Sequence, residues 1–561
     1  MSPTTTEESS LLTLDELAAR FAAAARSLWP DADPVVQFEA PRRSEFGDVA
    51  TNVAFGLARA ARKKPQDIAA DVIARALDDD GVRATVLDAT PLAGFVNLTL
   101  RPRFWQRVVG DVLREGASYG KAPATGETIS LEFGSANPTG PLAVVQGRAL
   151  SIGDTLANAL RHQGNRVFVE WIINDAGNQI RQFGYSILAR YRQLFGEDAA
   201  LPDDGYAGEY VVEIARALRE RDGDRWLRAP DDEAAVVAGR FGRDTMVAEQ
   251  QADARAFRVH YDLWQSEQEL HEAGAIRDGI DRLRALGRIY ERDGATWLRT
   301  TDAGDDQDRV VIRRDGIPTY LANDIAYHYA KLQRSDRVVD ILGPDHHGYI
   351  GRLNALAAAY GRPGAIEVLI AQQVTLKRGA EEVKMSKRAG DIITLREVLD
   401  EVGVDAARFF FVMLSTDQPL TFDLDLAKRQ TNDNPVYYVQ YGHARIASVL
   451  RRARESHAAQ LAAAERGDGL DALTDPAELA LVRRLAEFGP TVAGVARARA
   501  PHRLPKYARE VASEFHQFYD ACRVLGDDAA VTTARLALCL AAKAILATTL
   551  GLCGVVAPDT M

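Results

Sequence analysis

Residues 129–173 read ISLEFGSANPTGPLAVVQGRALSIGDTLANALRHQGNRVFVEWII, and they carry the signals of a strand, a turn, a helix and a second strand. ISLEF (129–133) and VFVEWII (167–173) are apolar runs of strand length, and residues 143–164 have apolar side chains at helical spacing. Such a unit predicts two parallel strands joined by a helix. The stretch therefore predicts an α/β fold built on a parallel sheet.

The turn GSANPTGPL (134–142) is suited to a close approach of an anion. Gly140 permits a tight backbone, and Pro141 is expected at the first helical position, where its missing N–H costs nothing. The free amides of the helix start and the positive end of its dipole favour phosphate groups. Since any strand–turn–helix unit has such a turn, it is a weak indication of nucleotide binding by itself.

The regions around this unit predict a multidomain chain. Amphipathic patterns over 11–29 and 50–78 and the alternating run FVNLTL (95–100) predict a small α+β module. Strand-like runs RVVIR (309–313) and VVDILG (338–343) predict that the parallel sheet resumes after a helical insertion. The predicted divisions are a flexible N-terminus (1–10), an α+β domain (11–122), an α/β domain (123–432) with an insertion at about 180–290, and an all-α domain (433–561).

The composition indicates a soluble protein of a reducing compartment. Its 561 residues are too many for one core, and the only cysteines, Cys522, Cys539 and Cys553, form no CxxC pair. We therefore expect a cytoplasmic protein without a disulfide framework or a metal-ligand cluster. The apolar run at 535–556 contains Lys543, which favours a buried helix over a membrane span. The net charge of −11 argues only against indiscriminate polyanion binding.

The segment VKMSKRAGDIITL (383–395) carries the most specific chemistry. Lys384 and Lys387 flank Ser386 on a glycine-containing segment. An ammonium on a flexible stem can follow a phosphate as charge develops during reaction. A solvated basic loop is the alternative, but KMSKR (384–388) follows the second half of a predicted split sheet.

With KMSKR in that place, the sequence resembles class I aminoacyl-tRNA synthetases, and further strings resemble the bacterial arginyl-tRNA synthetases among them. The N-terminal FGDVATNVAFGLA (46–58) resembles the added domain of that family. The resemblance covers essentially the whole chain, in order. The remaining strings are SANPTGPL (135–142), EWIINDAGNQI (170–180), YLANDIAYH (320–328), GPDHHGY (343–349) and DNPVYYVQYGHARI (433–446).

The resemblance implies a split Rossmann-type catalytic domain, an N-terminal tRNA-binding domain and a helical anticodon-binding bundle. It implies activation of L-arginine by ATP to arginyl-adenylate, with transfer to tRNA-Arg and release of AMP and pyrophosphate. Mg²⁺ is expected to arrive with ATP, held mainly by its phosphates. Members of the family are usually monomers, and they generally need tRNA before they activate arginine. We expect no membrane association.

The arginine pocket is also implied by the resemblance. A guanidinium offers five donors in a rigid fork and prefers planar carboxylate acceptors. Tyr320 and Asp324 are four residues apart and share one face if that segment is helical, although Asp324 could merely cap a helix there. Gln372 is placed with an uncertainty of one residue, because Gln373 is adjacent. The candidates are Glu132, Ser135, Asn137, Tyr320, Asp324 and Gln372.

Three further groups of candidates follow from the matching motifs. The ATP-binding candidates are Pro138, Thr139, Gly140, His346, His347, Gly348 and Met385. The catalytic candidates are Lys384, Lys387, Ser386 and Gln146. The tRNA-binding candidates are Tyr437, Tyr441, His443 and Arg445, an aromatic and basic cluster on which unpaired bases could stack.

The segment after the Gly-Pro-Leu turn departs from the family. Its members usually carry His-x-Gly-His there, whereas residues 143–146 are Ala-Val-Val-Gln. Losing one preorganised donor of this sort costs about 2.7–4 kcal/mol of transition-state stabilisation. Gln146 keeps an N–H donor, and Lys384, Lys387 and Arg148 could contribute more. The branched Val145 lies where close approach of the adenine is expected, and we have no physical account of that change.

These features favour an active arginine–tRNA ligase with a rearranged set of phosphate contacts. The alternative is a catalytically impaired synthetase-like protein that binds tRNA or regulates. A ligase that passes arginine to another acceptor is a third possibility, which the anticodon-like cluster argues against.

Overall fold

The computed structural model of the chain describes residues 11–39, 41, 43–346, 348–383 and 393–561. These residues form two compact units, and three of the five boundaries between them fall inside helices of the C-terminal region. The first unit comprises Met1–Tyr119, Ile446–Glu487 and Glu514–Ala544. The second unit comprises Gly120–Arg445, Phe488–Ser513 and Ile545–Met561.

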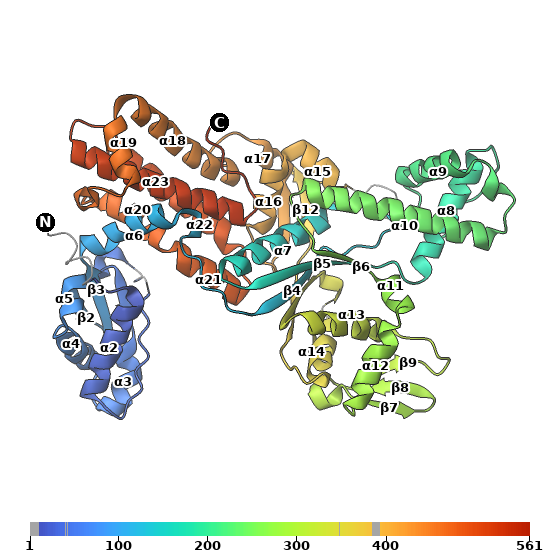
Figure 1. The fold of residues 1–561 in the computed structure, drawn as a ribbon, viewed down its shortest axis with the longest axis horizontal. Coiled ribbons are helices and arrows are strands. Elements are labelled where there is room, and N and C mark those ends of the chain that lie inside the picture. Colours follow the sequence, from blue (N-terminus) through green and yellow to red (C-terminus); the bar gives the residue numbers. More distant parts are fainter. Residues whose placement is uncertain (1–10, 40, 42, 347, 384–392) are drawn as a thin grey trace. The chain divides into compact units, whose positions relative to one another are not determined.

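The N-terminal part of the first unit is an α+β module, as the apolar patterns predict (Figure 1). Its first helix begins at a capping box, in which Thr13 and Glu16 satisfy each other's backbone amides. The three-stranded antiparallel sheet has the order β1-β3-β2 and includes the predicted strand FVNLTL. The elements are α2 (Leu14–Leu28), β1 (Val49–Thr51), α3 (Val53–Ala61), α4 (Pro65–Ala76), α5 (Asp80–Thr85), β2 (Val86–Leu92), β3 (Phe95–Leu100) and α6 (Pro102–Glu115).

A five-stranded parallel sheet with the order β11-β10-β4-β5-β6 organises the second unit. Strand β4 pairs on one edge with β5, the next strand in the sequence, and on its other edge with β10, which comes much later. The direction of winding therefore changes between β4 and β10, and ligands of open α/β sheets bind at the carboxyl end of such a switch point. The strands are β4 (Thr128–Phe133), β5 (Arg166–Ile173), β6 (Leu263–Ser266), β10 (Arg337–Leu342) and β11 (Ile366–Ile370).

Helices cover both faces of this sheet. Helix α7 (Val144–His162) connects β4 to β5, as predicted, and α13 (Tyr320–Arg334) lies across β10 and β4 from the other side (Figure 1). Gly153 of α7 lies so close to Phe133 that an added Cβ would meet the ring at 2.1 Å. Because side chains alternate along a strand, Glu132 faces α13 when its neighbour Phe133 faces α7.

Helix α7 begins three residues later than the prediction. Val144 is its first residue and Ala143 its N-cap, so Pro141 is not at the first helical position. The physical reason is a backbone pairing: Leu395 N–H donates to the Leu142 carbonyl at 2.7 Å, and Val144 N–H lies 3.4 Å from the Ile393 carbonyl oxygen. This pairing keeps residues 142–143 extended beside the segment that follows residues 384–392.

The predicted insertion is helical, with one exception. Helices α8, α9 and α10 fill most of it, but β6 lies within the predicted insertion and returns to the parallel sheet beside β5. The prediction for 309–313 is wrong in a different way, because β9 belongs to a separate antiparallel sheet of order β7-β8-β9. The elements are α8 (Asn178–Gln193), α9 (Glu209–Asp222), α10 (Asp231–Ala256), α11 (Glu267–Glu272), α12 (Ala275–Ala285), β7 (Ile289–Arg292), β8 (Ala295–Leu298) and β9 (Arg309–Ile312).

After β10 the chain completes the second unit with a small mixed sheet and short helices. Strand β12 pairs with β13 in antiparallel and with β14 in parallel orientation. The elements are α14 (Tyr349–Ala359), β12 (Val374–Arg378), β13 (Glu381–Glu382), α15 (Leu395–Val402), α16 (Val404–Val412), β14 (Leu420–Asp423) and α17 (Leu424–Lys428).

Residues 433–561 are helical, as predicted from their apolar spacing. Helix α23 is the single helix among the described residues that is long and apolar enough to cross a membrane, and 61% of its apolar window is buried within the protein. Such burial is typical of a core helix. The helices are α18 (Pro435–Ser456), α19 (Ala458–Glu465), α20 (Pro476–Ala486), α21 (Phe488–Ala498), α22 (Arg503–Ala521) and α23 (Ala529–Leu552).

Candidate active site

A row of three acidic residues crosses the middle of the parallel sheet. Asp340 on β10 pairs in register with Glu132 on β4, which pairs in register with Glu170 on β5. All three are buried, with at most 6% of each residue exposed. Helix α13 covers the row with cations: the Lys331 ammonium donates to both Glu132 and Asp340, and Arg334 donates to Glu170.

Mutual charge compensation governs the protonation of this row. Burial raises the pKa of Glu132, and the Lys331 ammonium opposes that rise. Burial acts in the same direction on Asp340, but the charges of Lys331 and His328 outweigh it and hold the Asp340 pKa below its usual range. Buried ions persist only when paired and hydrogen-bonded, so the row and α13 depend on each other.

Asp324 is buried one turn into α13 with one carboxylate oxygen unsatisfied. Its Oδ1 accepts from the Tyr327 hydroxyl at 2.9 Å. Its Oδ2 has no hydrogen-bond partner among the described residues, and the nearest cation is the Arg352 guanidinium at 3.8 Å. Burial raises the pKa of Asp324, while the charge of His328 acts to lower it. A buried acceptor of this kind is costly unless a ligand supplies the donor.

Glu267, at the first position of α11, is a second carboxylate at this place that sequence analysis missed. It accepts a hydrogen bond from the Asn323 amide at 2.6 Å. Burial, together with the negative charges of Asp175 and Asp324, raises the pKa of Glu267 to about 7. The signal that could have found it is its position directly after β6, a strand that was itself assigned to the helical insertion.

The other predicted arginine-binding residues lie at the carboxyl ends of neighbouring strands. Ser135 donates to Glu132 at 2.8 Å and accepts from the Ile172 amide, and Asn137 is exposed beside Asn174. Tyr320 starts α13, so the helical spacing to Asp324 is confirmed, but Tyr320 is 75% exposed whereas Asp324 is 5% exposed. Gln372 follows β11 and is half-buried.

Two insertion helices hold the predicted nucleotide turn in place. The Tyr210 hydroxyl of α9 donates to the Thr139 carbonyl at 2.8 Å. Gln250 of α10, which is fully buried, donates to the carbonyls of Asn137 and Gly140, each at 3.1 Å. The insertion therefore fixes the backbone of the turn through hydrogen bonds, which its charged sequence did not predict.

The start of α7 presents apolar side chains and one amide. Val144 is buried, Val145 and Gln146 are half-buried, and Gln146 Oε1 has no hydrogen-bond partner among the described residues. A 180° rotation of the Gln146 amide exchanges Oε1 and Nε2 with little change in shape. The position of Oε1 can therefore equally hold the N–H donor.

Arg148 cannot serve as the additional phosphate contact that the sequence suggested. It is fully buried, and its guanidinium donates to the carbonyls of Gln372 and Ser415, each at 2.9 Å. Burial lowers the Arg148 pKa to about 10. Arg148 therefore fastens the end of β11 to α7.

Several predicted nucleotide-binding residues follow β10 or lie outside the described residues. His346 ends a short 3-10 turn (Pro344–His346), stacks near Tyr349 and lies 3.4 Å from the Asp345 carboxylate; Gly348 follows it. The structure does not describe His347, Lys384, Met385, Ser386 or Lys387.

The predicted tRNA-binding cluster is only partly accessible. Tyr437 and Tyr441 on α18 stack with their ring centres 6.1 Å apart, and Tyr441 is 37% exposed. His443 is 3% exposed, and its Nδ1 lies 2.8 Å from the Pro558 carbonyl oxygen, so in this structure it fastens α18 to the C-terminal segment. Arg445 is half-buried.

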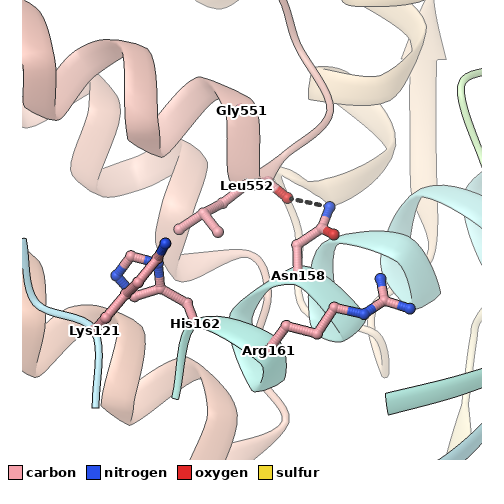
Figure 2. A pocket seen from close by; sticks show the side chains of 6 residues that line it. All are labelled: Lys121, Asn158, Arg161, His162, Gly551 and Leu552. Carbon is pink, nitrogen blue, oxygen red and sulfur yellow. Dashed lines mark hydrogen bonds between the residues drawn. The ribbon is translucent and has the colours of Figure 1, made fainter. Parts of the chain in front are cut away.

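A hollow of about 330 Å³ lies away from these residues, at the carboxyl ends of α7 and α23. Figure 2 shows Asn158 reaching the Leu552 carbonyl oxygen, with Lys121, Arg161 and His162 around it. Cations at helix carboxyl ends compensate the negative end of the dipole. The hollow therefore has a structural explanation. Within the described ranges, no group of three His, Cys, Asp or Glu side chains could hold a metal ion.

Three family models match the chain. "Arginyl tRNA synthetase N terminal domain" matches residues 15–100, "tRNA synthetases class I (R), catalytic domain" matches 243–414, and "DALR anticodon binding domain" matches 439–561.

Similar proteins extend over nearly the whole chain. The arginine–tRNA ligase of Syntrophotalea carbinolica is 44% identical over 94% of this chain and 95% of its own length. That of Moorella thermoacetica is 44% identical over 97% of both chains. A solved putative arginyl-tRNA synthetase from Campylobacter jejuni superposes with a TM-score of 0.75 at 32% identity, covering 82% of this chain and 100% of the other. Thermus thermophilus arginyl-tRNA synthetase, at 22% identity, shares the fold over 98% of this chain and 100% of its own, with a TM-score of 0.78.

Proposed function

Because this chain belongs to the arginyl-tRNA synthetases, a class I family, we propose that the carboxyl edge of its parallel sheet binds L-arginine and ATP. The chain is an arginine–tRNA ligase, whose partners are L-arginine and tRNA-Arg. The family uses ATP and typically Mg²⁺. Here Mg²⁺ comes with ATP and is held mainly by its phosphates. The protein acts as a cytoplasmic monomer.

The proposed arginine site has two carboxylates at the guanidinium end. Asp324 and Glu267 receive the planar fork of N–H donors, and the unsatisfied Oδ2 of Asp324 supports this assignment. Glu132, Ser135, Asn137, Tyr320 and Gln372 complete the pocket. A cationic ligand fits the charges there, because no described cation donates a hydrogen bond to Oδ2 of Asp324 and the Arg352 guanidinium remains 3.8 Å away.

The proposed ATP site uses the turn Pro138–Thr139–Gly140, the amides at the start of α7, and His346, His347, Gly348 and Met385. Lys384, Ser386 and Lys387 stabilise the charge that develops on the phosphates. Ala-Val-Val-Gln at 143–146 stands where the family carries His-x-Gly-His, and Gln146 supplies the donor that the second histidine would give. The backbone pairing of 142–144 with 393–395, which brings the segment after KMSKR in the sequence beside this turn, supports the proposal.

Two aromatic surfaces are proposed to contact unpaired bases of tRNA-Arg. One is the stacked pair Tyr437 and Tyr441, with Arg445 near them in the sequence. The other is in the N-terminal module, where Phe55 and Phe95 are 46% and 43% exposed with their ring centres 5.3 Å apart. Base–aromatic stacking contributes about 1–3 kcal/mol per base. His443 is left out of this proposal because it is buried.

The unsatisfied, buried Asp324 carboxylate is the observation that carries the arginine site, and the variant Asp324→Asn tests it. Removing one partner of a buried charge pair costs about 2–5 kcal/mol, so kcat/KM for arginine should fall by roughly 30- to 5000-fold. The matched control is Asp281→Asn, an exposed aspartate of α12 paired with Arg284, which should leave arginine kinetics unchanged. A native KM for arginine in Asp324→Asn would show that Asp324 does not bind the substrate.

A further inference from the structure

One buried network of charges lies beneath both ends of the proposed arginine pocket. Lys331 links Glu132 to Asp340, with 2.8 Å between its Nζ and Asp340 Oδ1. The other oxygen of Asp340 lies 2.8 Å from Nε2 of His328, and Nδ1 of His328 lies 2.8 Å from the carbonyl oxygen of Asp324. The chain of contacts therefore runs without interruption from the end of β4 to the guanidinium end of the pocket.

We propose that Lys331 and His328 are positioning residues for arginine binding, which act through Asp340 to fix Glu132 and Asp324 relative to each other. The inference rests on the proposed placement of Glu132 and Asp324 in the pocket. Neither Lys331 nor His328 is more than 1% exposed, so each acts through its neighbours and not by touching the substrate.

Lys331 makes the acidic pair on β4 and β10 possible. Glu132 and Asp340 are opposite each other in the register of two adjacent strands, and like charges in that position repel. The ammonium between them donates to both and offsets their mutual repulsion. Its replacement by an apolar side chain leaves two buried carboxylates, of which one must take up a proton or move.

His328 fixes the turn of helix that carries Asp324. It lies four residues later on α13, and its ring reaches back to the Asp324 carbonyl. The adjacent Tyr327 ring, 4.6 Å from the imidazole, holds Oδ1 of Asp324 through its hydroxyl. Asp324 is thereby held through both backbone and side chain, and only Oδ2 remains for a ligand. Both ring nitrogens of His328 therefore face oxygen atoms, Nδ1 the Asp324 carbonyl and Nε2 the Asp340 carboxylate.

The same helix offers a matched control. Arg334 lies three residues after Lys331 and donates to Glu170, the third member of the acidic row, which also accepts from Ser130. Glu170 is fully buried, so the loss of Arg334 also strands a carboxylate. Its pair contacts neither Asp324 nor Asp340, and Arg334→Met therefore tests whether mere damage to α13 weakens arginine binding.

The experiment measures KM for arginine, KM for ATP, kcat and the thermal unfolding midpoint in tRNA charging assays. The variants are Lys331→Met, Lys331→Arg, His328→Leu, His328→Gln and Arg334→Met. We expect Lys331→Met and His328→Leu to raise KM for arginine by about tenfold or more with KM for ATP within about threefold, because the substrate's binding geometry is lost. Lys331→Arg and His328→Gln should recover most of that loss. Arg334→Met should lower the unfolding midpoint and leave KM for arginine unchanged.

The inference is overturned if folded His328→Leu retains the native KM for arginine, or if Arg334→Met raises that KM as much as Lys331→Met does. If Lys331→Met does not fold, the values of KM for arginine in His328→Leu, His328→Gln and Lys331→Arg test the positioning role. Glu132→Gln and Asp324→Asn distinguish a failure of the proposed arginine pocket from a failure of the positioning role. Unchanged arginine kinetics in both would contradict the proposed pocket itself, whereas losses in both without losses in the network variants would contradict only the positioning role.

Discussion

The two helices that begin at the carboxyl edge of the parallel sheet differ sharply in what they offer a ligand. Helix α13 presents a buried carboxylate on a network of buried ion pairs. Helix α7, whose N-cap is Ala143, begins with Val144 and Val145 and offers one side-chain amide, Gln146. The proposed arginine end is thus defined by fixed side-chain charges. The proposed phosphate end would depend on backbone amides, on one glutamine and on the lysines of KMSKR.

This difference has a chemical reason. A guanidinium carries a permanent charge and rigid geometry, so fixed carboxylates recognise it well. The phosphates of ATP change charge distribution as pyrophosphate leaves, and donors that reach them can come from backbone or mobile side chains. The phosphate end can therefore tolerate substitution where the arginine end cannot.

The largest effect expected at the phosphate end tests whether Gln146 donates to the phosphates. Gln146→Ala should lower arginine-dependent ATP–pyrophosphate exchange, measured with tRNA present, by about 100- to 1000-fold, because a lost preorganised donor costs about 2.7–4 kcal/mol. Gln163→Ala, at the other end of α7, serves as the control and should have no effect. Unchanged activity in Gln146→Ala would indicate that backbone amides and lysines, not Gln146, donate to the phosphates. Helix α7 would then contribute no side-chain donor, in contrast to the fixed carboxylate of α13.

A smaller effect should appear in the pH dependence of arginine use. Burial raises the Glu267 pKa to about 7, and a guanidinium binds its ionised form more tightly. Affinity for arginine should therefore rise as pH increases toward 7 and level off above it, a change of roughly tenfold per pH unit at most below the pKa. Measuring kcat/KM for arginine between pH 6 and pH 8.5 checks this.

Two variants on α11 separate this effect from the general pH response of the enzyme. Glu267→Gln should flatten the rise, while Glu272→Gln, on the same helix and exposed, should keep it. A native profile in Glu267→Gln would show that another group is responsible.

The smallest effect concerns the branched side chain at the second position of α7. Val145→Gly should lower KM for ATP by less than about fivefold, because removing a half-buried side chain opens space but glycine weakens the helix start by about 0.5–1 kcal/mol. Val145→Ala separates the two contributions, since it opens most of the space and preserves the helix. A large rise in KM for ATP in both variants would mean that Val145 itself packs against the nucleotide.

Local patterns in the sequence predict most of the fold. The strand–helix–strand unit at 129–173, the first helix and FVNLTL are confirmed because each signal is contained in a few adjacent residues. The pairing of RVVIR was predicted wrongly, because hydrophobicity shows that a segment is a strand but not which distant strand it joins. Strand β6 was missed for a related reason: its four residues carry too little pattern inside a helical region.

The site shows the same division between local and long-range information. The segment that carries Tyr320 and Asp324 is helical, which is the condition under which their spacing places them on one face. The burial of Arg148 and His443 and the arrival of Glu267 beside Asn323 depend on residues 56 to 267 positions away along the chain. No short motif contains such information, so these residues could be placed only by the structure.

The measurement that tests the account most directly is charging of a tRNA-Arg transcript by the unmodified protein, with labelled arginine, ATP and Mg²⁺, alongside tRNA binding. The account predicts charging at a rate ordinary for such enzymes, about 1–10³ per second, despite Ala-Val-Val-Gln at the start of α7. Intact tRNA binding without charging would contradict this prediction, because residues 143–146 would then mark a phosphate site that does not support catalysis.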